Sequence, residues 1–307
     1  MLTAILLCIA GLAGLALGGE LLVRGAVGIA QKLNVSTLFT GLVIVGAATS
    51  MPEMVASVQA ALAGSPDIAW GNIVGSNIAN SLLILGVTAL VAPIVVTGMG
   101  RRDAVVALAL SALLWGLALS GVGARWIGLA FLALLVAYIV WRYRHPGLAM
   151  PGEEHVGHPP GWLVAGGLFA GGLAVLVAGG QALVSGAIDL ARLIGVSETA
   201  IGLTVVAVGT SLPELAASLA AAARGRPGLA LGNVVGSNIY NILLIGGATM
   251  SIAPFALPAS LAGIQMALLM GSAAVLLALL WRGRTIGRLA GGLLTLVFVA
   301  NTIFVFA

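Results

Sequence analysis

Two short segments place a glutamate next to a proline inside otherwise apolar stretches. They read TSMPE at Thr49–Glu53 and TSLPE at Thr210–Glu214. A proline inside a helix removes a backbone hydrogen bond and frees carbonyl groups about one turn upstream, here near positions 46–48 and 207–209. Each threonine lies four residues before its glutamate, so the hydroxyl and the carboxylate share a helix face. Such hard oxygen ligands suit Ca²⁺ or Na⁺ rather than zinc or copper.

A second polar motif follows each glutamate. It reads GNIVGSNIAN at Gly71–Asn80 and GNVVGSNIYN at Gly232–Asn241. Within each copy a serine and an asparagine four residues apart share a face, and these are Ser76 with Asn80 and Ser237 with Asn241. If this helix packs beside the proline–glutamate helix, its oxygens close the site from a second side. The remaining asparagines are equally well explained by hydrogen bonds between helices.

The number of candidate ligands fits a cation site. Two carboxylates, four hydroxyls, two amides and a few carbonyls exceed the six to eight oxygens that Ca²⁺ takes. Two glutamates neutralise one divalent ion, and the surplus of ligands suits several monovalent ions that replace it. A kinked helix with a protonated glutamate is the alternative for a single copy, but two equivalent intramembrane acids favour function.

Both motifs belong to a duplicated unit. Residues 41–86 align with residues 202–247 at one constant offset without a gap, and the similarity extends into the helix before each copy. Self-similarity at a fixed offset indicates a repeated structural unit. We therefore expect the two copies to form equivalent structures.

The composition is that of a membrane protein. The 307 residues are 61% hydrophobic and 7% charged, whereas about a quarter of the residues in a soluble domain are charged. A membrane helix needs about 20 apolar residues, which predicts ten spans, at roughly 2–30, 36–63, 68–91, 103–120, 125–143, 161–190, 197–222, 228–251, 258–281 and 285–306. A polar linker at 144–160 separates two five-span halves, 1–143 and 161–307.

The distribution of lysine and arginine predicts the orientation. With the N-terminus outside, all 13 basic residues except Arg125 and Arg192 fall at cytoplasmic ends of spans, as the positive-inside rule requires. Both termini then lie outside and the 144–160 linker is cytoplasmic, in an inner or plasma membrane. Because each half has five spans, the halves enter the membrane with opposite polarity. The predicted fold is an all-α membrane protein with ten transmembrane helices in two inverted-topology five-helix repeats.

Other function classes find little support. The net charge of +4 is scattered over span ends, so no nucleic-acid partner is expected. A single cysteine, Cys8, offers neither a disulfide nor a metal-binding spacing. The membrane segments contain no nucleophile with a base, so an enzyme is not expected, and neither a cofactor nor an obligate protein partner is indicated. Glu20 and Arg24, four residues apart, are expected to form an internal ion pair.

The four motifs together resemble the two alpha repeats of the cation/Ca²⁺ exchanger superfamily, and most of all the prokaryotic sodium/calcium exchangers. This resemblance implies an antiporter that exchanges three Na⁺ for one Ca²⁺ while its first and sixth helices slide across a rigid core. It implies a Ca²⁺ site formed by Glu53, Glu214, Thr49 and Thr210. It implies Na⁺ sites that add Ser50, Ser76, Ser211, Ser237 and the carbonyls of Ala207 and Gly46, with Asn80 and Asn241 in the middle.

Two alternatives to Na⁺/Ca²⁺ exchange stay open. Some archaeal members have an aspartate in place of Asn241, so this chain holds only two formal negative charges at the site. Proton/calcium exchangers of the same superfamily share the glutamates, which leaves H⁺/Ca²⁺ antiport as the main alternative. A cation channel could use the same oxygens but would conduct without coupling.

Overall fold

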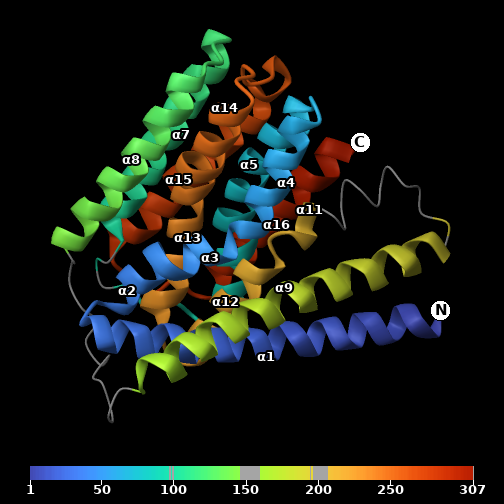
Figure 1. Cartoon of the computed structure of the whole chain (residues 1–307), viewed down its shortest axis with the longest axis vertical. Helices are drawn as coiled ribbons and strands as arrows, with labels where there is room; N and C mark the ends of the chain where they lie inside the picture. The colour runs from blue at the N-terminus through green and yellow to red at the C-terminus, as the bar shows by residue number, and fades with distance from the viewer. Residues whose placement is uncertain (97, 99, 146–159, 194, 196–206, 307) are drawn as a thin grey trace.

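The computed structural model describes the whole chain except residues 97, 99, 146–159, 194, 196–206 and 307. The described residues form a bundle of helices (Figure 1). The one isolated β-bridge among them joins Ile94 to Ile286 in antiparallel orientation. The expectation of an all-helical membrane protein is therefore confirmed for this part of the chain.

Seven helices in the described residues are long and apolar enough to cross a membrane, or eight if one bent pair counts as a span. The seven are α1 (Leu2–Leu33), α5–α6 (Pro66–Val91), α7 (Arg101–Ser120), α8 (Arg125–Arg144), α9 (Trp162–Leu193), α13–α14 (Pro227–Ile252) and α15 (Ile264–Arg282). The bent pair consists of Thr37–Thr49, which contains α2 (Thr37–Thr40), η1 (Gly41–Val45) and α3 (Gly46–Thr49), and of α4 (Met51–Leu62). The remaining elements are α11 (Ala207–Gly209), α12 (Leu212–Ala223), η5 (Ala259–Leu261) and α16 (Arg288–Phe306).

The predicted spans differ from the helices in two places. The first part of the predicted span 197–222 lies outside the described residues. The α-helix of the predicted span 258–281 begins only at Ile264, because Ala259–Leu261 form the 3₁₀-helix η5 and Gly263 is non-helical, with φ −83° and ψ −123°. The arrangement of ten spans stays a prediction.

Helices α1 and α9 lie side by side and cross the other helices at a steep angle (Figure 1). Glycines bring their backbones together. A β-carbon on Gly18 would lie 2.6 Å from the backbone nitrogen of Leu176, and one on Gly172 would lie 2.3 Å from that of Leu22. Such short distances exclude any larger side chain, so these two helices form one tightly packed, antiparallel pair.

Helix α13 (Pro227–Tyr240) is buried along almost its whole length in the centre of the bundle. It packs against α2, η1 and α3 from the first half of the chain and against α12 from the second. A β-carbon on Gly232 would lie 2.5 Å from the carbonyl oxygen of Leu38, and one on Gly236 would lie 2.5 Å from that of Leu42. These glycines therefore let helices from the two halves of the chain meet at backbone distance.

Candidate functional site

Each proline–glutamate motif marks a break in a helix. Ser50 has φ −79° and ψ 2°, and Ser211 has φ −90° and ψ 6°, and each directly precedes a new helix with proline at its start. At the first break the two helical parts are bent by 43°. Glu53 and Glu214 thus lie in the first turns of α4 and α12. The partial positive charge of a helix N-terminus stabilises a carboxylate in this position.

The two breaks face each other and exchange hydrogen bonds. The hydroxyl of Ser211 donates to Oε1 of Glu53 at 3.2 Å. The hydroxyl of Ser50 donates to Oε1 of Glu214 at 3.4 Å. Each serine therefore holds the glutamate of the other repeat, which brings both carboxylates into one buried cluster. Glu53 is 1% exposed and Glu214 is 2% exposed.

An asparagine from the second motif donates a hydrogen bond to the backbone carbonyl of each glutamate. The Nδ2 of Asn72 donates to the backbone carbonyl of Glu53 at 3.1 Å and to the hydroxyl of Ser57 at 2.9 Å. Asn233 makes the same two bonds to Glu214 and Ser218, at the same distances. The equivalent asparagines therefore act as interhelical hydrogen-bonding residues, one of the two roles expected for them. Their serine partners were not among the predicted site residues.

Several buried side-chain oxygens have no hydrogen-bond partner among the described residues. Five of them belong to the predicted site residues: Oε2 of Glu53, Oε2 of Glu214, Oγ of Ser237, Oδ1 of Asn80 and Oδ1 of Asn241. A buried polar atom without a partner costs free energy, so such atoms are rare in native structures. Their number here is the property expected of oxygens that bind a cation.

The helices that carry the asparagines are widened at these same residues. The π-helix η2 (Asn80–Ile84) begins at Asn80, and η4 (Asn241–Gly246) begins at Asn241. A π-helical turn is rare and concentrates at functional sites. Both side chains are 1% exposed, so the two copies of the second motif deliver their amides in the same way.

Thr49, Gly46 and Ala207 precede the two breaks by about one helical turn or less. Thr49 is fully buried, and its hydroxyl bonds the carbonyl of Val45 at 3.1 Å and Oδ1 of Asn233 at 3.2 Å. The Gly46 carbonyl accepts the backbone N–H of Ser50 at 3.2 Å, so the carbonyl expected to be free keeps only its second lone pair. Ser76 is 5% exposed. Ala207 begins the short helix α11 before the second break.

The two sides of the cluster are packed differently. A cavity of about 510 Å³ lies between α4 and α9 and reaches Thr210. On the other side α1 packs directly on α12, where a β-carbon on Gly19 would lie 2.9 Å from the carbonyl oxygen of Ala216. There Glu20 pairs with Arg24 at 2.6 Å, as expected, and also with Arg224 of the segment after α12. The cavity therefore separates α9 from α4, whereas α1 and α12 are in direct contact.

A second buried polar group was not predicted. Asp103 and Arg142 form an ion pair, with Nε 2.8 Å from Oδ1, and their side chains are only 2% and 4% exposed. The hydroxyl of Tyr138 donates to the same Oδ1 at 2.9 Å. The sequence signal was an aspartate directly after two arginines, but its partner is far along the chain.

The fold and the cluster around Glu53 and Glu214 define a multi-pass, all-helical membrane protein with a buried set of oxygens competent to bind a cation. Residues 3–144 and 164–307 match the family described as sodium/calcium exchanger protein. The chain therefore belongs to the sodium/calcium exchanger family, which confirms the resemblance seen in the motifs. The family is therefore one of exchangers of Na⁺ and Ca²⁺ rather than of enzymes.

Three similar proteins illustrate the match. The putative antiporter CaxA of Alkalimonas amylolytica is 38% identical over 325 residues, which cover 100% of both chains. The sodium/calcium exchanger MaX1 of Methanosarcina acetivorans is 31% identical, with 98% of each chain covered. A solved structure of the sodium-calcium exchanger NCX_Mj superimposes with a TM-score of 0.84 and 30% identity, and the match covers 97% of each chain.

Proposed function

We propose that this protein exchanges three Na⁺ for one Ca²⁺ across the membrane by alternating access to the buried cluster. The observation that carries the proposal is the pairing of the two glutamates. Each carboxylate uses one oxygen for a serine of the opposite repeat and keeps the other, buried, without a partner among the described residues. Two such oxygens facing one cluster suit a divalent cation, which supplies the missing interaction.

The proposed ligands divide into two groups. Ca²⁺ binds between Glu53 and Glu214, with Thr49 and Thr210 beside them. Na⁺ ions use the same carboxylates together with Ser50, Ser211, Ser76, Ser237 and the carbonyls of Gly46 and Ala207, with Asn80 and Asn241 between these positions. The buried oxygens of Ser237, Asn80 and Asn241 that have no partner among the described residues support this assignment.

Exchange follows from competition for the two carboxylates. Ca²⁺ and the Na⁺ set need the same pair of acids, so one cargo leaves before the other binds. Because Asn241 is neutral, three Na⁺ rely on hydroxyl and amide dipoles in addition to two formal charges. Exchange of three Na⁺ for one Ca²⁺ moves one net charge, which is worth about 2.3 kcal/mol per 100 mV of membrane potential.

The proposed architecture is ten membrane helices in two inverted repeats, 1–143 and 161–307, joined by a cytoplasmic linker at 144–160. The equivalent contacts support the repeat. Asn72 and Asn233 make the same bonds at the same distances, and a π-helix begins at both Asn80 and Asn241. With both termini outside, in an inner membrane, all basic residues except Arg125 and Arg192 lie at cytoplasmic ends of the spans, as the positive-inside rule requires.

Alternating access is proposed to come from α1 and α9, which move as one pair over the remaining helices. Two features support it. The glycine contacts between α1 and α9 join them tightly, and a cavity separates α9 from α4 whereas α1 packs directly on α12. Movement of the pair along the core would close the cavity next to α9 and open the contact between α1 and α12.

The test is ⁴⁵Ca²⁺ uptake into proteoliposomes under separately imposed ion gradients. With Na⁺ inside and the pH equal on both sides, we expect uptake that stops when Na⁺ is replaced by K⁺. A proton gradient without Na⁺ should drive none. Uptake driven by the proton gradient alone would establish H⁺/Ca²⁺ antiport instead, and uptake independent of both gradients would indicate a channel.

A further inference from the structure

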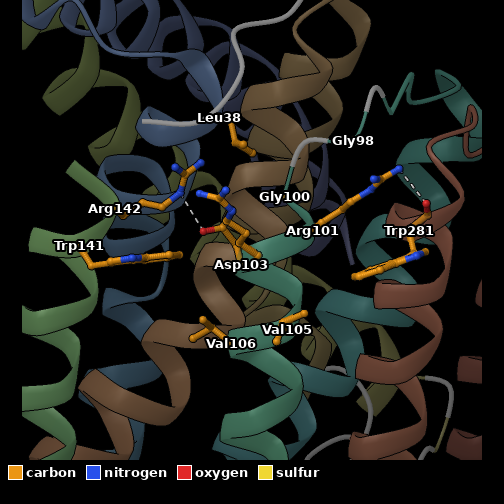
Figure 2. A pocket seen from close by; sticks show the side chains of 11 residues that line it. Leu38, Gly98, Gly100, Arg101, Asp103, Val105, Val106, Trp141, Arg142 and Trp281 are labelled. Atoms are coloured by element: carbon orange, nitrogen blue, oxygen red, sulfur yellow. Dashed lines mark hydrogen bonds and ion pairs between the residues drawn. The ribbon is translucent and has the colours of Figure 1, made fainter. Parts of the chain in front are cut away.

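A second cavity, of about 810 Å³, lies at the end of the bundle where α7 begins and α8 and α15 end (Figure 2). None of the proposed ion ligands lines it. Three of its lining residues are the arginines Arg101, Arg102 and Arg142, whereas Asp103 is the only acidic residue in the lining among the described residues. The cavity therefore has a surplus of positive charge that the exchange mechanism does not use.

Two of the arginines are held in place by their neighbours. Arg142 is neutralised by Asp103 and also donates to the backbone carbonyl of His145. Arg101 donates to the backbone carbonyls of Leu280 at 3.1 Å and Trp281 at 2.8 Å at the end of α15 (Figure 2). Arg101 is thus fixed as a cation, but no carboxylate partner is found for it in the part of the chain that the structure describes.

The third arginine is available to a ligand. Arg102 is exposed, and none of the described residues forms an ion pair or a side-chain hydrogen bond with it. Together Arg101 and Arg102 supply two guanidinium charges that Asp103 does not compensate. Guanidinium groups bind phosphate oxygens through paired, charge-assisted hydrogen bonds, which makes arginine the preferred side chain for such anions.

The position of the cavity corresponds to the headgroup level of a bilayer. Helix α7 begins at Arg101, α8 ends at Arg144 and α15 ends at Arg282, and all three are candidate membrane spans. Two tryptophans, Trp141 and Trp281, also line the cavity. Tryptophan and arginine concentrate at span ends, where lipid headgroups meet the hydrocarbon core.

Apolar side chains complete the lining. Leu38, Val105 and Val106 face the cavity beside the arginines (Figure 2). An inorganic phosphate ion would use the guanidinium groups only, whereas a phospholipid would also cover the apolar surface with its glycerol and acyl carbons. We propose that this cavity binds the phosphate headgroup of an anionic glycerophospholipid, as basic pockets between membrane helices do.

The test measures the affinity of the purified full-length chain in detergent for short-chain phosphatidylglycerol. Short-chain phosphatidylcholine and inorganic phosphate are the comparison ligands, and native mass spectrometry follows the bound state. We expect phosphatidylglycerol to bind, and the Arg102→Gln variant to bind it about fivefold more weakly, the loss expected for one basic residue at an anionic lipid surface. Arg102 is exposed, so this variant should fold.

The matched control is Arg284→Gln, which removes another exposed arginine just after α15 and outside the cavity lining. It should bind phosphatidylglycerol like the unchanged protein. Equal affinity for phosphatidylcholine, or an equal loss in both variants, would overturn the proposal. Inorganic phosphate that competes as strongly as the lipid would identify a site for free phosphate instead of a lipid site.

Discussion

Ser211 donates a hydrogen bond to Oε1 of Glu53 across 3.2 Å, although these residues belong to different copies of the repeat. The reverse pair, Ser50 with Glu214, is 3.4 Å apart. Each half therefore supplies a hydrogen bond to the glutamate of the other half, and neither half forms the cluster by itself.

Replacement of either acid by its amide, Glu53→Gln or Glu214→Gln, should reduce Na⁺-driven ⁴⁵Ca²⁺ uptake to the background of empty liposomes. Each change removes half of the charge that neutralises a divalent ion while it preserves the shape of the side chain. The matched control is Asp67→Asn, because Asp67 is an exposed acid that bonds Ser260 at 3.0 Å, away from the cluster. Near-normal uptake in both glutamine variants would refute the assignment of the site.

Removal of one crossing hydroxyl, in Ser50→Ala or Ser211→Ala, should raise the Ca²⁺ concentration at half-maximal uptake about tenfold. A hydrogen bond to a charged group contributes about 1.5–3 kcal/mol, and the lost hydroxyl is also a proposed Na⁺ ligand. The two variants should be similar, because their bonds are equivalent. Ser111→Ala serves as control, since the buried hydroxyl of Ser111 bonds only a carbonyl of its own helix, that of Ala107. Unchanged Ca²⁺ dependence in both variants would contradict this role.

Asn233→Ala should destabilise the protein more than Asn72→Ala, by about 1 kcal/mol for one additional hydrogen bond. Both asparagines support a glutamate in the same way, but only Asn233 also accepts the hydroxyl of Thr49. Thermal unfolding of the purified variants in detergent measures the order. Asn301→Ala, in α16, is the control without effect. The reverse order would show that the bond to Thr49 does not contribute.

Cross-links should distinguish the proposed moving pair from the core. A β-carbon on Gly19 of α1 would lie 3.2 Å from that of Ala220 in α12, and one on Gly28 of α1 would lie 3.0 Å from that of Ala165 in α9. In a Cys8→Ser background, oxidation of a cysteine pair at 19 and 220 should stop exchange. Oxidation of a cysteine pair at 28 and 165 should not inhibit exchange, because both positions lie within the moving pair.

Each cross-linked protein is its own control before oxidation, when both variants should transport. The distances between the β-carbons are similar, at 3.2 and 3.0 Å. Full exchange with the pair at 19 and 220 oxidised would contradict the proposed movement of α1 over α12.

The sequence suggested the candidate site residues because each proposed ligand has a partner at the same offset in the other copy. Glu53 with Glu214 and Asn80 with Asn241 could be paired without a structure. The hydrogen bond from Ser50 to Glu214 could not be predicted from the repeat, because it depends on how the two copies pack rather than on their similarity. The Asp103–Arg142 pair has no counterpart pattern, and its partners, one on α7 and one on α8, come together only in the folded structure.

The boundaries of the spans were less predictable where helix and non-helix are both apolar. Residues 253–263 are mostly apolar, but α15 begins only at Ile264, after the 3₁₀-helix η5 and the non-helical Gly263. Ser50 and Ser211 end one helix and begin another within what hydropathy predicts as a single span. Hydropathy alone does not predict such helix breaks.

The most direct test of the central claim is the position of a bound divalent cation. Crystals of the full-length protein grown without Na⁺ and soaked in Sr²⁺ should give one anomalous peak between the carboxylates of Glu53 and Glu214, within coordination distance of both. The peak should disappear in Glu53→Gln crystals treated in the same way. A peak elsewhere in the protein, or one that persists in this variant, would contradict the claim that the two glutamates jointly bind the transported ion.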